Sequence, residues 1–471
     1  MLSEESVNSV NPEHGFVDPT PIGWFDRKLF MHYPALLVGV YTGPSQEPRA
    51  QEYLQELRLL AKTHGIEVID SLAFSIRTFS AATFLSEGKL AELKEAVEKL
   101  GAKLVIFDDD ISPAQQRNLE NFLRVPVIDR AEVILGVFAD RAKTREAKLQ
   151  IELAQLKYIA PRLKRMWSHF SKQTGGGGGA GGGGYMKGEG EKQIEIDRRL
   201  LKQRVERLQS LIREVKHIRT TQRSRRERTG IPIFAIVGYT NAGKSTLMKL
   251  LTQADVFIED KLFATLDTTT RKFILPNTNQ ELLLIDTVGF IRKLPHHLVM
   301  AFRSTLEETV QADILLHVID ATHPMALEQA ETTLKVLKEL NAVDKRPIIT
   351  ILNKVDGLKE ESALKSQQAV YQKLRLTYPR AIDFSALEGY GIEKLFEEIA
   401  DVLRNRRHLF HLSIPQSEYH IVSEIMRHGH IHHQEYQDNN ILLEVEVPIE
   451  HMYRYEKYKC EQKNHSSTEV G

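Results

Sequence analysis

The stretch Gly238-Tyr239-Thr240-Asn241-Ala242-Gly243-Lys244-Ser245-Thr246 fits the pattern G-x-x-x-x-G-K-[ST], which is typical of a phosphate-binding loop. An apolar run at 233–237 precedes it and predicts a buried strand, and the apolar residues at 247–251 predict the buried side of a helix. In that context the glycines allow backbone N–H groups to surround phosphates at a helix N-terminus. Lys244 is predicted to reach the β- and γ-phosphates, and the Ser245 hydroxyl to bind Mg²⁺.

A second motif indicates which base the nucleotide carries. The apolar run at 348–352 predicts a strand that ends in Asn353-Lys354-Val355-Asp356. A carboxylate at Asp356 can accept hydrogen bonds from both the N1–H and the amino group of guanine. Adenine lacks that pair of donors, so it would leave a buried carboxylate unpaired. The two motifs together predict GTP and GDP as ligands.

Three further segments fit the same site. The strand predicted at 282–285 runs into Asp286-Thr287-Val288-Gly289, where Asp286 can hold the Mg²⁺ shell through water and the Gly289 N–H can meet the γ-phosphate. The segment Phe263-Ala264-Thr265-Leu266-Asp267 opens a threonine-rich loop, and one threonine there is expected to complete the Mg²⁺ coordination. An ordinary turn or strand start explains that loop equally well. Ser385-Ala386-Leu387 follows a short predicted strand and stands where a guanine-supporting loop is expected.

The group that orients the attacking water is not evident. Ras-like enzymes use a glutamine just after the D-x-x-G glycine, whereas this chain has Phe290, which cannot polarise water. Intrinsic hydrolysis is therefore predicted to be slow, and no catalytic base is identified. Asn241 resembles the asparagine of GTPases that place K⁺ beside the β- and γ-phosphates, where the ion would act as a fixed positive charge.

Composition sets limits on the rest. A length of 471 residues predicts about three domains, and 63 basic against 63 acidic residues leave any basic surface local. A single cysteine excludes an internal disulfide framework and a cysteine-based zinc site. The chain has no 18-residue apolar run and no secretory h-region, and we therefore expect a cytoplasmic protein with no membrane span. We further expect it to be a monomer.

The predicted fold class is α/β, with six regions along the chain. They are a disordered arm at 1–33, a small parallel α/β docking domain at 34–143, a helical hairpin at 144–228, a GTPase domain at 229–408, a small α+β domain at 409–460 and a disordered tail at 461–471. The docking domain is predicted to hold strands at 36–41, 67–69 and 104–107 and helices at 51–63, 89–100 and 113–123. Asp108-Asp109-Asp110 is interpreted as a solvated loop, with a metal or catalytic role as the alternative.

The predicted hairpin has two apolar seams, at 149–163 and 201–215, on either side of the glycine-rich loop 175–184. Glycine has no side chain to bury, so this tip is expected to be disordered. A plain interdomain linker is the alternative. From Arg198 to Arg228 twelve Lys or Arg stand against three Glu, and this excess favours contact with a phosphate backbone over a merely solvated helix face.

The C-terminal region is predicted to contain a half-buried strand at 441–447. His428, His430, His432 and His433 precede it, and a surface hairpin is favoured over a zinc site because no carboxylate or cysteine accompanies them at ligand spacing.

From about Pro34 to Tyr453, these parts resemble the HflX-type ribosome-associated GTPases. The resemblance is carried by 112–120 and 127–130 in the first domain, by 188–199 after the glycine loop, and by 238–246, 263–267 and 286–291 in the nucleotide motifs. It implies that Thr265 is the threonine on Mg²⁺ and that 263–267 lies along the nucleotide. It further implies binding to the large ribosomal subunit and its rRNA, a role in separating stalled or idle ribosomes, and a glycine loop directed toward the peptidyl-transferase region.

Two other functions remain open at this point. The chain could act in ribosomal RNA maturation or ribosome assembly, or it could be a guanine-nucleotide switch for a protein partner. Whether the protein protects mature large subunits or precursor RNA would separate the first alternative from ribosome splitting. Salt-independent binding to its target would favour the second.

Overall fold

The structure is a computed structural model that describes residues 33–162, 195–196, 198–215, 231–252, 262–263, 269–276, 280–294, 312–343, 346–358, 365–405, 407–448 and 452–460. It divides into two compact units, Met1–Asp140 with Lys148–Ser210, and Arg141–Ala147 with Leu211–Gly471. Both units combine helices with a mainly parallel sheet, so the predicted α/β class is confirmed. The bounds of the six predicted regions stay predictions, and the glycine-rich loop 175–184, Arg228 and the C-terminal tail lie outside the described residues.

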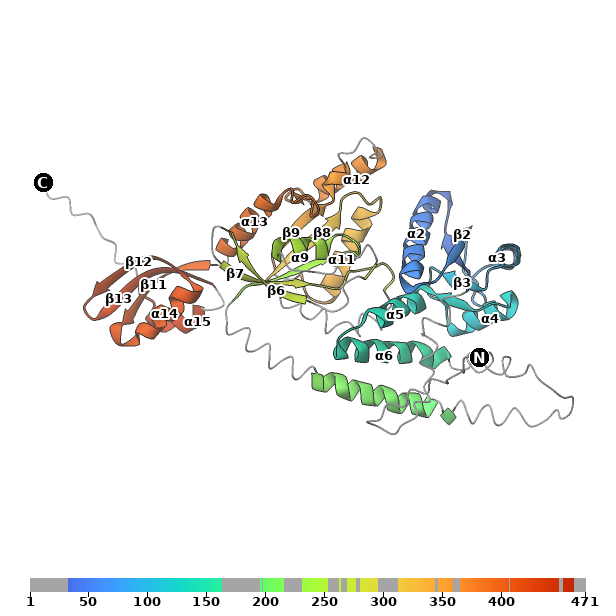
Figure 1. The fold of residues 1–471 in the computed structure, drawn as a ribbon, viewed down its shortest axis with the longest axis horizontal. Coiled ribbons are helices and arrows are strands. Elements are labelled where there is room, and N and C mark those ends of the chain that lie inside the picture. Colours follow the sequence, from blue (N-terminus) through green and yellow to red (C-terminus); the bar gives the residue numbers. More distant parts are fainter. Residues whose placement is uncertain are drawn as a thin grey trace, which may run out of the picture. The chain divides into compact units, whose positions relative to one another are not determined.

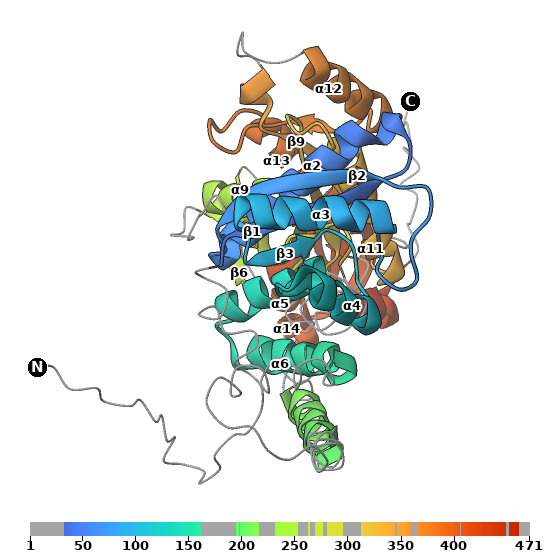
Figure 2. The same cartoon turned by 90° about the vertical axis from the view of Figure 1, so that its right-hand side faces the viewer.

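The first unit is built on a four-stranded parallel sheet of order β2-β1-β3-β4. Its strands are β1 (Ala35–Tyr41), β2 (Val68–Ser75), β3 (Leu104–Phe107) and β4 (Val127–Asp129). Its helices are α2 (Glu47–His64), α3 (Glu87–Leu100), α4 (Pro113–Leu123), α5 (Arg130–Arg141) and α6 (Arg145–Ile159), with short 3₁₀ turns at Pro44–Gln46 and Ala160–Arg162. Helices α2 and α3 lie on opposite sides of the sheet (Figures 1 and 2).

Local signals explain where these elements begin and end. Ser112 caps α4 by accepting a hydrogen bond from the Gln115 N–H, while the Gln115 side chain accepts from the Ser112 N–H. Gly65 and Gly101 end α2 and α3 in the left-handed conformation that glycine adopts at little cost. The predicted strands and helices of this region are confirmed, although β2 runs well past the predicted 67–69.

One prediction in this region is wrong. Asp108 is not part of a solvated loop: its side chain is buried, and its Oδ1 accepts a hydrogen bond from Arg130 Nη1 at 2.7 Å. Arg130 is itself fully buried, and its other nitrogen, Nη2, pairs with Glu56 at 2.5 Å. A buried charge requires such partners, so the acid at the end of β3 anchors the start of α5.

Helix α6 and the helix at 198–215 lie side by side in both views (Figures 1 and 2). Arg204 of the second helix pairs with Glu152 of the first, with 2.6 Å between Nη2 and Oε1. Leu201 and Leu208 are buried, as the predicted seam requires. The seam of α6 is broader than predicted, because polar Gln150 and Gln155 are buried along with Leu153 and Leu156.

The second unit contains a six-stranded sheet of order β10-β9-β8-β5-β7-β6, in which only β6 is antiparallel to its neighbour. Its strands are β5 (Ile233–Gly238), β6 (Thr269–Leu275), β7 (Gln280–Asp286), β8 (Ile314–Asp320), β9 (Ile348–Asn353) and β10 (Ile382–Asp383). Its helices are α9 (Lys244–Thr252), α11 (Ala326–Glu339), α12 (Lys365–Thr377) and α13 (Ile392–Asn405), with a 3₁₀ turn at Val355–Leu358.

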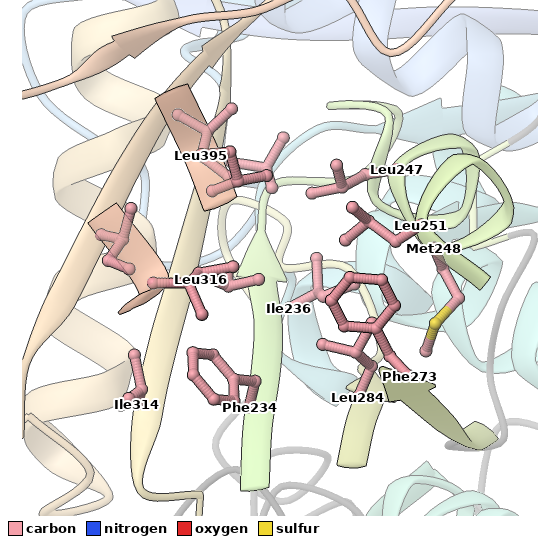
Figure 3. Close-up of a cluster of buried hydrophobic side chains, with 14 of the residues drawn as sticks. Phe234, Ile236, Leu247, Met248, Leu251, Phe273, Leu284, Ile314, Leu316 and Leu395 are labelled. Atoms are coloured by element: carbon pink, nitrogen blue, oxygen red, sulfur yellow. The ribbon is translucent and has the colours of Figure 1, made fainter. Parts of the chain in front are cut away.

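Two cores hold helices to this sheet. On one face, side chains of β5 and β8 pack against Leu247, Met248 and Leu251 of α9 and Leu395 of α13 (Figure 3). On the other face, Ile319 and Leu352 pack against α11 and α12. Burial of the apolar face of α9 fixes the helix whose N-terminus begins at Lys244, so the core positions the phosphate-binding loop.

The C-terminal part of the second unit is an antiparallel sheet of order β11-β13-β12. Its elements are β11 (Arg407–Pro415), α14 (Tyr419–His428), β12 (His430–Gln437), β13 (Asn440–Pro448) and α15 (Met452–Tyr455), with 3₁₀ turns at Gln416–Glu418 and Glu456–Tyr458. Asp438 and Asn439 both have positive φ and form the two-residue turn between β12 and β13. The predicted surface hairpin is therefore confirmed.

Candidate nucleotide-binding site

The predicted nucleotide motifs of this chain meet at the carboxyl ends of β5, β7, β8 and β9, the edge where open α/β sheets bind ligands. The loop from Gly238 to Gly243 joins β5 to α9, and its backbone has φ of 157° at Gly238, 62° at Asn241 and 93° at Gly243. A Cβ on Gly238 would collide with the Val318 carbonyl oxygen, and one on Gly243 with the Asn353 side chain. The sequence needs glycine at both positions because neighbouring strands approach there.

Lys244 begins α9 and is buried beneath the loop. Its Nζ donates a hydrogen bond to the Tyr239 carbonyl oxygen at 2.7 Å. Burial lowers the pKa of Lys244 to about 8, Asp286 opposes that effect and Lys354 adds to it. A phosphate beside this amine would favour its charged form, so the geometry suits an anionic ligand.

Ser245 and Asp286 form a donor set that fits Mg²⁺. The Ser245 hydroxyl donates to Asp286 Oδ2 at 2.8 Å, which brings two hard oxygen ligands together at the start of α9. Asp286 is fully buried at the end of β7. A magnesium ion prefers a few such protein oxygens together with phosphate and water, and the pair stands beside the loop predicted to hold the phosphates.

Asn353 joins two loops of the site. Its Nδ2 donates to the Ala242 carbonyl oxygen at 2.8 Å, and its Oδ1 accepts from the Ala386 N–H at 2.9 Å. The side chain is buried, so both bonds are shielded from water. The asparagine at the end of β9 therefore ties the phosphate-binding loop to the segment 385–387.

Lys354 and Asp356 flank the predicted base site. Lys354 Nζ lies 2.7 Å from Asp320 Oδ2, and Asp320 Oδ1 also accepts from the Thr322 hydroxyl at 2.6 Å. Asp356 is half-buried, and among the described residues its Oδ1 is shielded from solvent and has no hydrogen-bond partner. Such an oxygen is costly unless a ligand donates to it.

The remaining predicted residues fall into three groups. Thr287 donates from its buried hydroxyl to the Ile236 carbonyl oxygen at 2.7 Å, and Val288 is buried, so both side chains hold β7 to the core. Ser385 is buried, Leu387 is 83% exposed, and the Ala386 N–H between them donates to Asn353 Oδ1. Phe263 is buried, whereas Ala264, Thr265, Leu266 and Asp267 lie outside the described residues.

Gly289 stands directly against the phosphate-binding loop. A Cβ built on it would lie 2.7 Å from Thr240 Cγ2 and 2.9 Å from Lys244 Nζ. The next residue, Phe290, is buried and cannot face an attacking water. Sequence reasoning identified both residues but missed Tyr239 as a side chain of interest, because nothing in the linear motif shows what its hydroxyl contacts.

A magnesium site of this kind uses few side chains, and among the described residues the geometry suggests no other kind of metal centre. Within the described part of the chain, no group of three or more His, Cys, Asp or Glu is arranged to hold a metal ion. His432 pairs instead with Glu446, with 3.1 Å between Nε2 and Oε1. No helix among the described residues is long and apolar enough to cross a bilayer.

Comparison with known proteins agrees with this geometry. Three family models match consecutive parts of the chain: "GTP-binding GTPase N-terminal" at 51–139, "GTP-binding GTPase Middle Region" at 141–226 and "50S ribosome-binding GTPase" at 233–354. GTPase HflX of Chlamydia pneumoniae is 44% identical over 88% of this chain and 86% of its own length, and GTPase HflX of Akkermansia muciniphila is 45% identical over 90% and 96%.

Among solved structures, that of SsGBP in complex with GDP covers 78% of this chain and 98% of its own, at 25% identity and a TM-score of 0.42. The family follows from the sequence relatives, because both are at least 44% identical over at least 88% of this chain. The chain belongs to the HflX family of GTPases.

Proposed function

We propose that this GTPase binds guanine nucleotide and Mg²⁺ at the carboxyl edge of the β5–β10 sheet and uses GTP to act on the large ribosomal subunit. The observation that carries the proposal is the convergence of three motifs, distant in sequence, on one edge. Lys244, Ser245 and Gly289 surround the place for phosphates, and Asp356 stands where the base is recognised.

The base specificity is assigned to Asp356. Guanine presents two adjacent N–H donors, which would satisfy the carboxylate oxygen that has no partner among the described residues. Asn353 supports the same pocket through its bonds to Ala242 and Ala386. In the segment of Ser385, Ala386 and Leu387, the Ala386 N–H provides this support, and the Leu387 side chain faces solvent.

Asp356→Asn tests this assignment. An amide at this position donates where the carboxylate accepts, so it should disfavour guanine and favour xanthine, which has a carbonyl in place of the amino group. We expect GTP affinity to fall at least tenfold and XTP affinity to rise, as measured by calorimetric titration of both nucleotides. Unchanged affinities for both would contradict the assignment.

Ser245 is proposed to bind Mg²⁺ directly, and Asp286 to hold the metal's shell through water. Thr265 is proposed as the second protein ligand when the γ-phosphate is present. When bound, Mg²⁺ would neutralise charge that develops on the phosphates. Ser245 and Asp286 already lie together, while Thr265 is outside the described residues.

Asn241 is proposed to favour K⁺ beside the phosphates. Equal hydrolysis rates in Na⁺ and K⁺ at matched ionic strength would exclude this role of K⁺.

Two observations support a ribosomal target. The model matched at 233–354 describes a 50S ribosome-binding GTPase. The helix at 198–215 carries Lys or Arg at 198, 199, 202, 204, 207 and 213 against Glu at 206 and 214, and Lys202, Arg207 and Arg213 are exposed. Exposed basic side chains on one helix are suited to the phosphate backbone of rRNA. Separation of stalled or idle ribosomes is the proposed outcome, and a role in subunit assembly is the second candidate.

A further inference from the structure

We propose that Tyr239 is a positioning residue for GTP hydrolysis, whose hydroxyl holds the segment after Gly289 against the phosphate-binding loop. The inference rests on the nucleotide site proposed above. It assigns a role to a side chain that the loop motif leaves unspecified, because position 239 is one of the variable positions in G-x-x-x-x-G-K-[ST].

The two segments are already joined through their backbones. The Thr240 N–H donates to the Phe290 carbonyl oxygen at 2.8 Å, and the Phe290 N–H donates to the Gly238 carbonyl oxygen at 3.1 Å. Tyr239 and Phe290 thus form an isolated parallel β-bridge. The Thr240 N–H is engaged in this bridge, so the amides that face a phosphate begin after it in the loop.

The Tyr239 side chain extends this bridge by one more bond. Its hydroxyl accepts a hydrogen bond from the Arg292 N–H at 2.7 Å, and both residues are buried. Residues 291–294 have no regular secondary structure, and Lys293 has a φ of 52°. In such a segment a buried backbone N–H depends on a side chain or another loop for its partner, and here the Tyr239 hydroxyl is that partner.

The same residue contacts the lysine of the loop. The Tyr239 carbonyl oxygen accepts from Lys244 Nζ at 2.7 Å. Tyr239 therefore touches the loop lysine with its main chain and the segment after Gly289 with its side chain. Any movement that carries residues 290–292 away from the loop must break the hydroxyl bond as well as the two backbone bonds.

The position of Gly289 decides which nucleotide state the hydroxyl bond favours. A Cβ on Gly289 would lie 2.9 Å from Lys244 Nζ, so the glycine stands beside the amine that reaches the γ-phosphate. A segment held in this place has the Gly289 N–H close to where that phosphate would sit. The bond is therefore assigned to the triphosphate-bound state, and GDP, which lacks the γ-phosphate, should be indifferent to it.

Tyr239→Phe removes the hydroxyl and keeps the ring. We expect GDP affinity to change by less than about twofold. Affinity for a non-hydrolysable GTP analogue and the single-turnover hydrolysis rate should each fall about threefold to tenfold, the range for one net hydrogen bond. Hydrogen exchange of the Arg292 amide should accelerate, while the amides of β5 and β7 keep their protection. A purely structural role would weaken GDP and the analogue equally and would not single out this amide.

Tyr158→Phe is the matched control, because it removes a buried hydroxyl that donates to Asp129 at 2.9 Å in the first unit. It should leave the ratio of GDP to analogue affinity unchanged. The proposal would be overturned if Tyr239→Phe kept the ratio of GDP to analogue affinity, the single-turnover hydrolysis rate and the protection of the Arg292 amide found in the unaltered chain. Faster hydrolysis by the variant would overturn it as well. GDP binding by the unaltered chain is a separate test of the nucleotide site. If the unaltered chain did not bind GDP, both the proposed site and the role of Tyr239 would be wrong.

Discussion

At the scale of single residues, the GTPase sheet contains a histidine whose environment opposes its charge. His317 lies on β8, is 1% exposed and has neither ring nitrogen hydrogen-bonded among the described residues. The Tyr378 ring meets it edge-on with 6.2 Å between centroids. Burial lowers the pKa of His317 to about 4, so the folded protein holds this imidazole neutral.

The stability of the second unit should therefore fall in mild acid. Above pH 6.5 the imidazole is neutral in both states and the shift has no effect. Between pH 6.5 and about 4 only the unfolded state takes up the proton, so the free energy of unfolding should fall by about 3 kcal/mol. Urea unfolding of the unaltered protein and of His317→Leu at pH 7, 5.5 and 4.5 would measure this loss. The variant should lack the part of the loss that His317 causes. Parallel losses in both proteins would contradict the assignment.

At the scale of elements, the site depends on bonds that join strand ends. Asn353→Ala would remove both amide bonds between β9 and the loops at Ala242 and Ala386 and leave buried backbone groups without those partners. We expect a loss of about 1–3 kcal/mol in the free energy of unfolding and at least a tenfold loss of GDP affinity. Calorimetry and urea unfolding measure the two effects.

Asn118→Ala is the control, because it removes an asparagine side-chain amide outside the unit that contains the nucleotide site. Its Nδ2 donates to the Ala82 carbonyl oxygen at 2.9 Å in the first unit, so the variant should keep its nucleotide affinity. If Asn353→Ala also kept its GDP affinity, the proposed support of the base pocket by Asn353 would be wrong.

The elements also show what the sequence could and could not predict. β5 and α9 were predictable because apolar runs flank a glycine motif, and α4 because Ser112 and Pro113 mark its start. Helix α5 was missed because nearly its whole length is buried, which removes the periodicity that reveals a surface helix. The bond from Asn353 to Ala242 spans 111 residues of chain, and no local pattern encodes such a contact. The buried pairing of Asp108 with Arg130 was hidden for the same reason.

At the scale of the whole molecule, the proposed function links the nucleotide site to a ribosomal target. The helix at 198–215 carries exposed basic side chains, and its Leu201 and Leu208 are buried within the first unit. If the proposed target binds one nucleotide state more tightly than the other, binding of the target and binding of GTP are coupled, and such coupling is reciprocal for affinities. Preference for the target should therefore depend on the γ-phosphate.

Co-sedimentation of the full chain with purified ribosomal subunits tests this claim most directly. The chain should pellet with large subunits, more strongly with a non-hydrolysable GTP analogue than with GDP, and the difference should disappear in Lys244→Ala, which cannot hold the phosphates. Raising the salt concentration should weaken binding, because in the proposed complex basic side chains contact rRNA phosphates. Absence of binding to large subunits with either nucleotide, or equal binding to both subunits whatever the nucleotide, would contradict the account.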